Sequence, residues 1–157
     1  MRVTAKVDYA VRAAAELASA QLAAEGARSV VKGEAIARAQ DIPLRFLESI
    51  LGDLRRAGIV ASQRGAEGGY WLARPAAEVT VADLIRAVEG PLGDVHGAPP
   101  EEASYRGAAH DVQQVWVATR AALREVLEVT DLAALVRDGL PATVRALAST
   151  PEAWSRR

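Results

Sequence analysis

The chain has 157 residues, of which half are apolar, a formal net charge of −1 and no cysteine. This length and apolar content suit one domain with an appended helix, and the missing cysteines exclude disulfides, thiolate metal sites and cysteine nucleophiles. Charged residues interrupt the N-terminal segment, and no apolar run is long enough for a signal core or a membrane span, so we expect a cytoplasmic protein with no membrane partner.

The charge is unevenly distributed along the chain. Residues 1–75 carry 11 Lys and Arg against 8 Asp and Glu, whereas residues 76–157 carry 8 against 12. The positive excess is modest, so a DNA-binding first half would need two subunits that add their phosphate contacts.

The first third of the chain predicts two helices separated by a short strand. A helix from about Lys6 to Ala24 would bury one stripe of small and apolar residues, and Ser29 to Val31 favour a strand. A second short helix, Gly33 to Ala39, precedes a turn at residues 40–42. The stripe on the first helix consists of Val7, Ala10, Val11, Ala14, Leu17 and Ala18.

A third helix begins at Pro43, which suits a first helical position because its missing N–H costs nothing there. Its apolar residues recur at helical spacing and predict one face turned toward a core: Phe46, Leu47, Ile50, Leu51 and Leu54. Arg45, Glu48 and Ser49 fall off that face, and Gly58 is typical of a helix stop. The pattern predicts a helix-turn-helix with a polar surface available to a partner.

Two short β-prone runs, Ile59 to Ser62 and Tyr70 to Ala73, flank a glycine-rich segment. Glycines supply the positive φ that a hairpin tip needs, so we expect a small two-stranded ribbon. Arg64 lies at the base of its tip, where a guanidinium can enter a narrow minor groove or pair with phosphate.

The ordered set of these motifs is specific. It comprises Thr4, Tyr9–Arg12, Ile36–Ala37, Ile42–Pro43, Phe46–Glu48, Leu54–Arg55, Ala57–Gly58, Arg64–Gly65, Gly68–Tyr70 and Val88–Leu92. The chain thereby resembles the Rrf2 family of bacterial winged helix-turn-helix regulators, closely over residues 1–92 and more loosely beyond. The resemblance implies a mainly α fold with a small β wing and a long dimerisation helix.

The resemblance also implies roles for individual residues in binding double-stranded DNA. Arg45, Glu48 and Ser49 would face base edges in the major groove, and Arg64 would be the wing arginine, next to Gly68 and Gly69 at the tip. The alternative for the three helix residues is a solvated surface. The expected phosphate contacts are Thr4, Tyr9, Arg12 and Lys32, although a tyrosine in such a place is equally suited to packing.

The second half predicts a fourth helix, a linker and a dimerisation helix. Thr80 and Asp83 have capping-box spacing, and Gly90-Pro91 would end the fourth helix. We therefore divide the chain into a DNA-binding domain (1–92), a linker (93–110) and a dimerisation helix with two short closing helices (111–157). The stripe expected to pair with a second copy is Val112, Val115, Trp116, Thr119, Leu123, Val126 and Leu127.

No cofactor is expected. Many relatives hold an iron–sulfur cluster through cysteines between the fourth helix and the dimerisation helix, but residues 93–114 contain none. Asp8 matches a position from which some relatives supply a non-cysteine ligand, yet one carboxylate cannot assemble that site. His96 and His110 match no specific metal motif; they are interpreted as surface residues, with metal binding left open.

Together these features predict a homodimeric DNA-binding transcriptional regulator that reads an imperfect palindrome, with repression as the family habit. The signal is left open between a small molecule, a protein partner and control by abundance. The alternative is a winged-helix protein-interaction module. No paired nucleophile and base is visible, so we expect no enzymatic activity.

Overall fold

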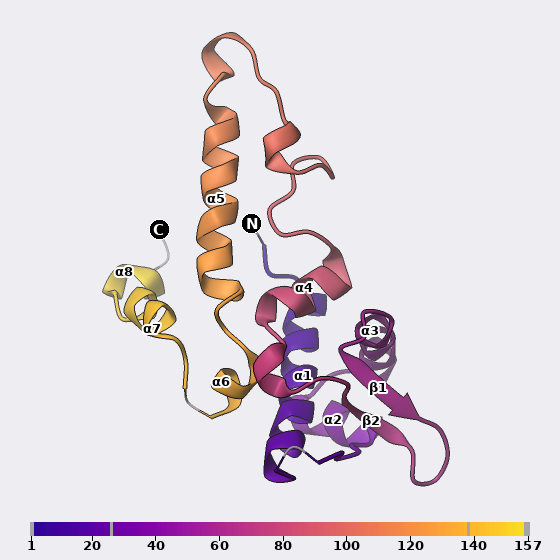
Figure 1. The fold of residues 1–157 in the computed structure, drawn as a ribbon. Helices are drawn as coiled ribbons and strands as arrows, with labels where there is room; N and C mark the ends of the chain where they lie inside the picture. The colour runs from indigo at the N-terminus through magenta and orange to yellow at the C-terminus, as the bar shows by residue number, and fades with distance from the viewer. Residues whose placement is uncertain (1, 26, 138, 156–157) are drawn as a thin grey trace.

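The computed structural model describes residues 2–25, 27–137 and 139–155. A helical body carries a two-stranded wing on one side, and a long arm formed by residues 93–111 and α5 projects from the body away from the wing (Figure 1). The elements are α1 (Ala5–Ala23), α2 (Gly33–Gln40), α3 (Leu44–Arg56), β1 (Val60–Gln63), β2 (Gly69–Leu72), α4 (Val81–Glu89), α5 (Val112–Leu127), α6 (Leu132–Val136), α7 (Ala142–Ala148) and α8 (Pro151–Trp154). The predicted fold class is confirmed.

α1 forms the centre of the body. Its alanines Ala10, Ala13, Ala14 and Ala18 are completely buried and let α3, α4 and α6 approach closely. The expected inner stripe is buried except for Val11, which is partly buried against the same core. No helix within the described ranges is both long and apolar enough to cross a bilayer.

α3 packs on α1 through Leu47, Ile50, Leu51 and Leu54, each at most 1% exposed. Phe46, which the helical period assigned to the same face, is 62% exposed, so that prediction was wrong. Each helical residue advances about 100° around the axis, which places Phe46 at the edge of the buried arc rather than within it. The helix begins one residue later than expected.

The wing strands pair in the antiparallel register Val60↔Leu72, Ala61↔Trp71, Ser62↔Tyr70 and Gln63↔Gly69. Both strands lie one residue from the predicted limits. The predicted strand at residues 29–31 was wrong: one bridge joins Val31 to Tyr70, with hydrogen bonds of 2.8 Å in both directions. That segment leaves the sheet after a single pair.

The capping box predicted for α4 is present, with Thr80 accepting from the Asp83 N–H and Asp83 accepting from the Thr80 N–H. The two closing helices expected after α5 are also present. α6 returns to the body, where Leu132 is completely buried against α1. The predicted domain limits stay a prediction, but the core of the body draws on residues beyond position 111.

Candidate DNA-binding surface

The outward face of α3 presents Arg45, Glu48 and Ser49, all exposed. The buried leucine and isoleucine face holds the helix against α1, and Gly58, at φ 70°, turns the chain from α3 into the wing. Arg55 donates to the Ser62 hydroxyl at 3.2 Å, and this hydrogen bond joins α3 to β1. The two parts of the surface are therefore fixed relative to each other.

Lys6 ties α3 to the rest of the body. Its ammonium donates to the Val88 carbonyl at the end of α4 and pairs with Asp53 on α3, both at 2.8 Å. The hydrogen bond from Lys6 holds the pKa of the Asp53 carboxyl below its usual range, with Arg56 contributing as a second cation. One side chain thus connects α1, α3 and α4.

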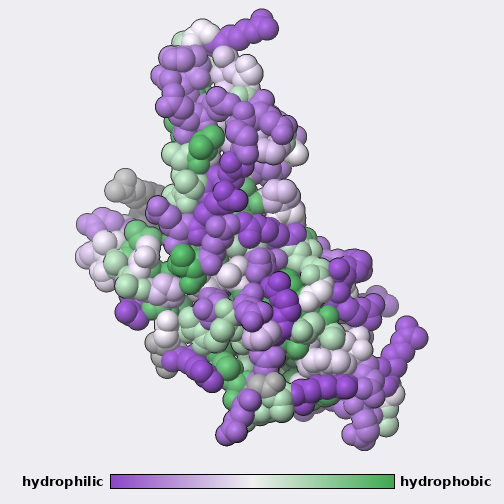
Figure 2. Space-filling view, in the orientation of Figure 1, coloured by the Kyte–Doolittle hydropathy of each residue, from purple (hydrophilic) through white to green (hydrophobic). Residues whose placement is uncertain are grey.

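The wing tip spans residues 64–68 and is hydrophilic, at the lower right of the molecule (Figure 2). Gly68 and Gly69 have no room for a side chain: a Cβ at Gly68 would lie 2.3 Å from the Gln63 carbonyl, and one at Gly69 2.5 Å from the Val31 carbonyl. The glycines therefore permit the tight tip that the sequence predicts.

Two cations predicted to contact DNA lie at this tip. Arg64 is exposed and has no hydrogen bond or ion pair among the described residues. Lys32, which precedes α2, donates from Nζ to the Ala66 carbonyl. The wing tip therefore carries two cations in addition to the polar side chains of α3.

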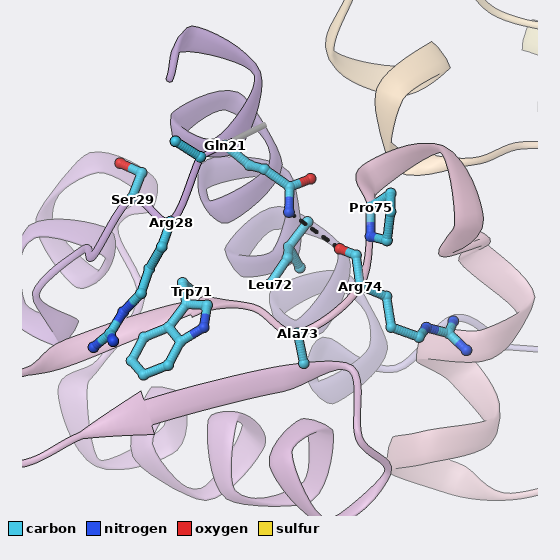
Figure 3. A pocket seen from close by; sticks show the side chains of 9 residues that line it. Gln21, Arg28, Ser29, Trp71, Leu72, Ala73, Arg74 and Pro75 are labelled. Atoms are coloured by element: carbon cyan, nitrogen blue, oxygen red, sulfur yellow. Dashed lines mark hydrogen bonds between the residues drawn. The ribbon is translucent and has the colours of Figure 1, made fainter. Parts of the chain in front are cut away.

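Arg28 is a further cation beside the wing, and the sequence analysis did not identify it. Its guanidinium lies 3.9 Å from the Trp71 ring centroid and donates to the Gln63 side chain at the wing base. Figure 3 shows the Arg28 guanidinium beside the indole ring, while Arg74 points away from it. Arg28, Trp71 and Arg74 are among the residues that line a hollow of about 260 Å³. No local pattern in the sequence pairs Arg28 with Trp71.

Three of the predicted phosphate contacts belong to α1: Thr4 is its N-cap, and Tyr9 and Arg12 lie within the helix. Thr4 caps α1, accepting from the Val7 N–H at 3.2 Å, and its hydroxyl donates to Glu89. Tyr9 is partly buried, with the Arg12 guanidinium 5.5 Å from its ring. Arg12 also pairs with Asp8 at 3.0 Å and donates to Gln40. These three residues are already engaged within the fold, and their contact with DNA stays a prediction.

The stripe predicted for dimerisation divides between two surroundings. Five of its members face a cavity of about 650 Å³ between α5, the linker, α4 and the N-terminal segment: Val112, Trp116, Thr119, Leu123 and Leu127. Val115 points outward and is 55% exposed, and Val126 is partly buried. Arg120 pairs with Glu101 at 2.6 Å and so fastens the linker to α5.

A family model, Rrf2, described as an iron-dependent transcriptional regulator, matches residues 3–138. The chain belongs to the Rrf2 family. An HTH-type transcriptional regulator of Mycobacterium tuberculosis strain H37Rv is 45% identical over 148 residues, covering 94% of this chain and 89% of that protein. CymR of Bacillus subtilis is 34% identical over 132 residues, covering 84% and 87%.

Two solved structures of such regulators match the fold of this chain. The structure of CymR, the global cysteine regulator of B. subtilis, matches with a TM-score of 0.71 and 29% identity over 87% of this chain and 96% of that one. IscR of T. potens matches with a TM-score of 0.69 and 28% identity over 100% and 93%. This Rrf2 protein is accordingly a DNA-binding transcriptional regulator with a winged helix, and not an enzyme.

The donor set does not fit an iron–sulfur cluster, although the family model is described as iron-dependent. Such clusters are held mainly by thiolates, and this chain has no cysteine. Within the described ranges, no three His, Asp or Glu side chains come close enough to hold a metal ion. His110 lies 3.0 Å from Asp111, and His96 lines the cavity beside α5.

Proposed function

We propose that this Rrf2 protein is a cytoplasmic repressor that binds a palindromic operator as a homodimer, without an iron–sulfur cluster. The observation that supports it is a set of polar side chains on neighbouring elements: the exposed Arg45, Glu48 and Ser49 of α3, with Lys32 and Arg64 at the wing. We propose repression because it is the usual action of regulators in this family.

The chemistry of this surface suits the two grooves of DNA. A carboxylate such as Glu48 can accept from a cytosine amine and a guanidinium such as Arg45 can donate to guanine, while Arg64 suits a narrow minor groove or a phosphate. Lys32, Tyr9, Arg12 and Thr4 would set the register through the backbone. Two copies presented one helical turn apart would each read one half-site.

A small organic effector is the signal that the cavity beside α5 supports. Its volume of about 650 Å³ lies within the usual range of ligand pockets. Its wall combines Val7 and Ile85 of the body with Trp116 and Leu123 of the arm. A ligand held by both parts would favour one arrangement of arm and body through differential affinity. A protein effector or control by abundance would leave this cavity unused.

The test is selection of bound duplexes from a random pool, followed by variants on the enriched site. We expect a palindrome. Glu48→Ala should change the preference at defined bases by about 5- to 150-fold, since a good base contact is worth about 1–3 kcal/mol. Arg64→Ala should weaken all sequences alike and lower the salt slope by about one if the contact is to phosphate.

Arg137→Ala is the matched control, because Arg137 is exposed at the end of α6 and outside the proposed surface. It should leave both preference and salt slope unchanged. Weak, salt-insensitive binding by the wild-type protein would instead support a winged-helix protein-interaction module.

A further inference from the structure

Phe46 is an aromatic side chain that the core does not use. It is 62% exposed on α3, while Leu47 and Ile50 beside it are at most 1% exposed. Exposure of a phenyl ring forfeits the free energy that burial would provide, so the fold gains nothing from Phe46 in this position. A partner that covers the ring would recover that free energy.

The position of Phe46 defines what can cover it. It is the third residue of α3, and Ser49 follows at the i+3 position, on the same side of the helix. Ser49 is in turn the i+4 neighbour of Arg45. The N-terminal residues of a recognition helix are those that contact base edges in the major groove. The ring therefore lies among the side chains proposed to read bases.

Thymine presents the matching chemistry, because it carries a methyl group in the major groove that the other three bases lack. We propose that Phe46 is a specificity-determining residue that reads thymine in each half-site by covering its 5-methyl group. The inference rests on the proposed function. Arg45, Glu48 and Ser49 would read hydrogen-bonding groups, and Phe46 would read the apolar one.

The test removes the methyl group alone. In the enriched duplex, each thymine is replaced in turn by deoxyuridine, which keeps the base pair and its hydrogen-bonding groups. For the wild-type protein we expect one position per half-site where deoxyuridine weakens binding about fourfold, the effect of one buried methyl group. All other thymine positions should tolerate the replacement.

Substitution of the ring then completes the cycle. Phe46→Ala should bind the thymine duplex about as weakly as the wild type binds the deoxyuridine duplex, and should no longer distinguish the two. Phe46→Leu, which keeps an apolar side chain, should retain part of the discrimination. Val129→Ala is the control: it truncates an exposed apolar residue beyond α5 and should preserve the full wild-type ratio.

Three results would overturn the inference while leaving DNA binding intact. The wild type tolerates every deoxyuridine, Phe46→Ala loses affinity equally for both duplexes, or Phe46→Ala keeps the wild-type ratio. Equal loss would indicate contact with the sugar–phosphate backbone or a structural role. If the wild type enriches no sequence at all, the proposed function fails first and the inference fails with it.

Discussion

Lys6 joins three helices through one ammonium group. Its partners are the carboxylate of Asp53 on α3 and the Val88 carbonyl on α4, and the Asp53 side chain is only 14% exposed. A partly buried carboxylate that accepts from two cations is stabilised in its charged form. The orientation of α3 therefore depends on the negative charge of Asp53, which protonation in acid removes.

We expect Asp53→Asn to destabilise the protein at neutral pH and to matter less in acid. The pKa of Asp53 is lowered in the folded state, chiefly by the Lys6 hydrogen bond. Its stabilisation is therefore fully present above the ordinary aspartate pKa, about 3.9, and is lost as the pH falls through the lower folded value. Urea unfolding at pH 7 and pH 3 should show a difference of about 1 kcal/mol at the higher pH that shrinks at the lower one.

Asp8→Asn is the matched control, since Asp8 forms an exposed pair with Arg12 within one helix. We expect it to change the unfolding free energy by less than about 0.5 kcal/mol. An equal effect of Asp53→Asn at both pH values would contradict the electrostatic explanation.

Single residues also show where sequence reasoning stops. Leu47 and Leu54 were assigned to the core correctly because the helical period identifies the centre of a buried face. Phe46 was assigned wrongly because the period does not locate the edge of that face. Arg28 was missed because its contact with Trp71 forms only when β2 returns beside the segment that precedes α2, which no local pattern records.

The helix α3 carries a glycine, Gly52, on its outward side. A Cβ there would meet the Arg56 guanidinium at an ordinary 3.6 Å, so alanine fits. We expect Gly52→Ala to raise the free energy of unfolding by about 0.5–1 kcal/mol, because glycine loses more backbone entropy in a helix. The added methyl should weaken binding to the enriched duplex, because α3 would then lie farther from the groove.

Gly58→Ala, two residues after the end of α3, should have the opposite effect on the free energy of unfolding. Its Cβ would meet nothing within 4 Å, yet φ is +70°, a conformation that alanine adopts at a cost. Chemical denaturation should therefore show a raised free energy of unfolding for Gly52→Ala and a lowered one for Gly58→Ala. Titration with DNA should show the weaker binding expected of Gly52→Ala. If Gly52→Ala bound DNA as tightly as the wild type, that face of α3 would not approach the duplex closely.

Elements with local signals were predicted, whereas strand pairing and burial that depend on distant partners were not. The α4 capping box is contained in residues 80–83, so its spacing sufficed. The segment at 29–31 is β-prone, but only Val31 meets a partner strand. α6 was expected as a closing helix of the dimerisation segment (111–157). Leu132 instead completes the core of the body, because the chain returns to α1 after the arm.

Considered as a whole, the molecule has a body with a complete core and an arm without one. No residue of α5 is buried in the part of the chain that the structure describes, and Val115, Trp116 and Val117 are all exposed. Figure 2 shows apolar side chains on the projecting arm. A second copy packed against the exposed side of α5 around Val115 would bury that side in a two-fold interface and would also present a second DNA-binding surface.

We therefore expect the wild type to be a dimer in light scattering and Val115→Asp to be a monomer of 16.6 kDa. In a two-fold interface the substitution introduces two like charges in an apolar environment, which is unfavourable without partners. Affinity for the full palindrome should fall by a factor of about 100 or more, because a dimer gains from linking two binding events. Affinity for a single half-site should be unchanged, since α3 and the wing remain intact.

Gln114→Asp is the control that separates charge from interface. It adds the same side chain at the neighbouring exposed position of α5, and it should leave both the dimer and the palindrome affinity intact. Loss of half-site binding in Val115→Asp would indicate that the arm supports the body rather than the pairing. A wild-type protein that remained monomeric while binding the palindrome tightly would remove the need for a second copy, since one body presents one reading helix and one wing.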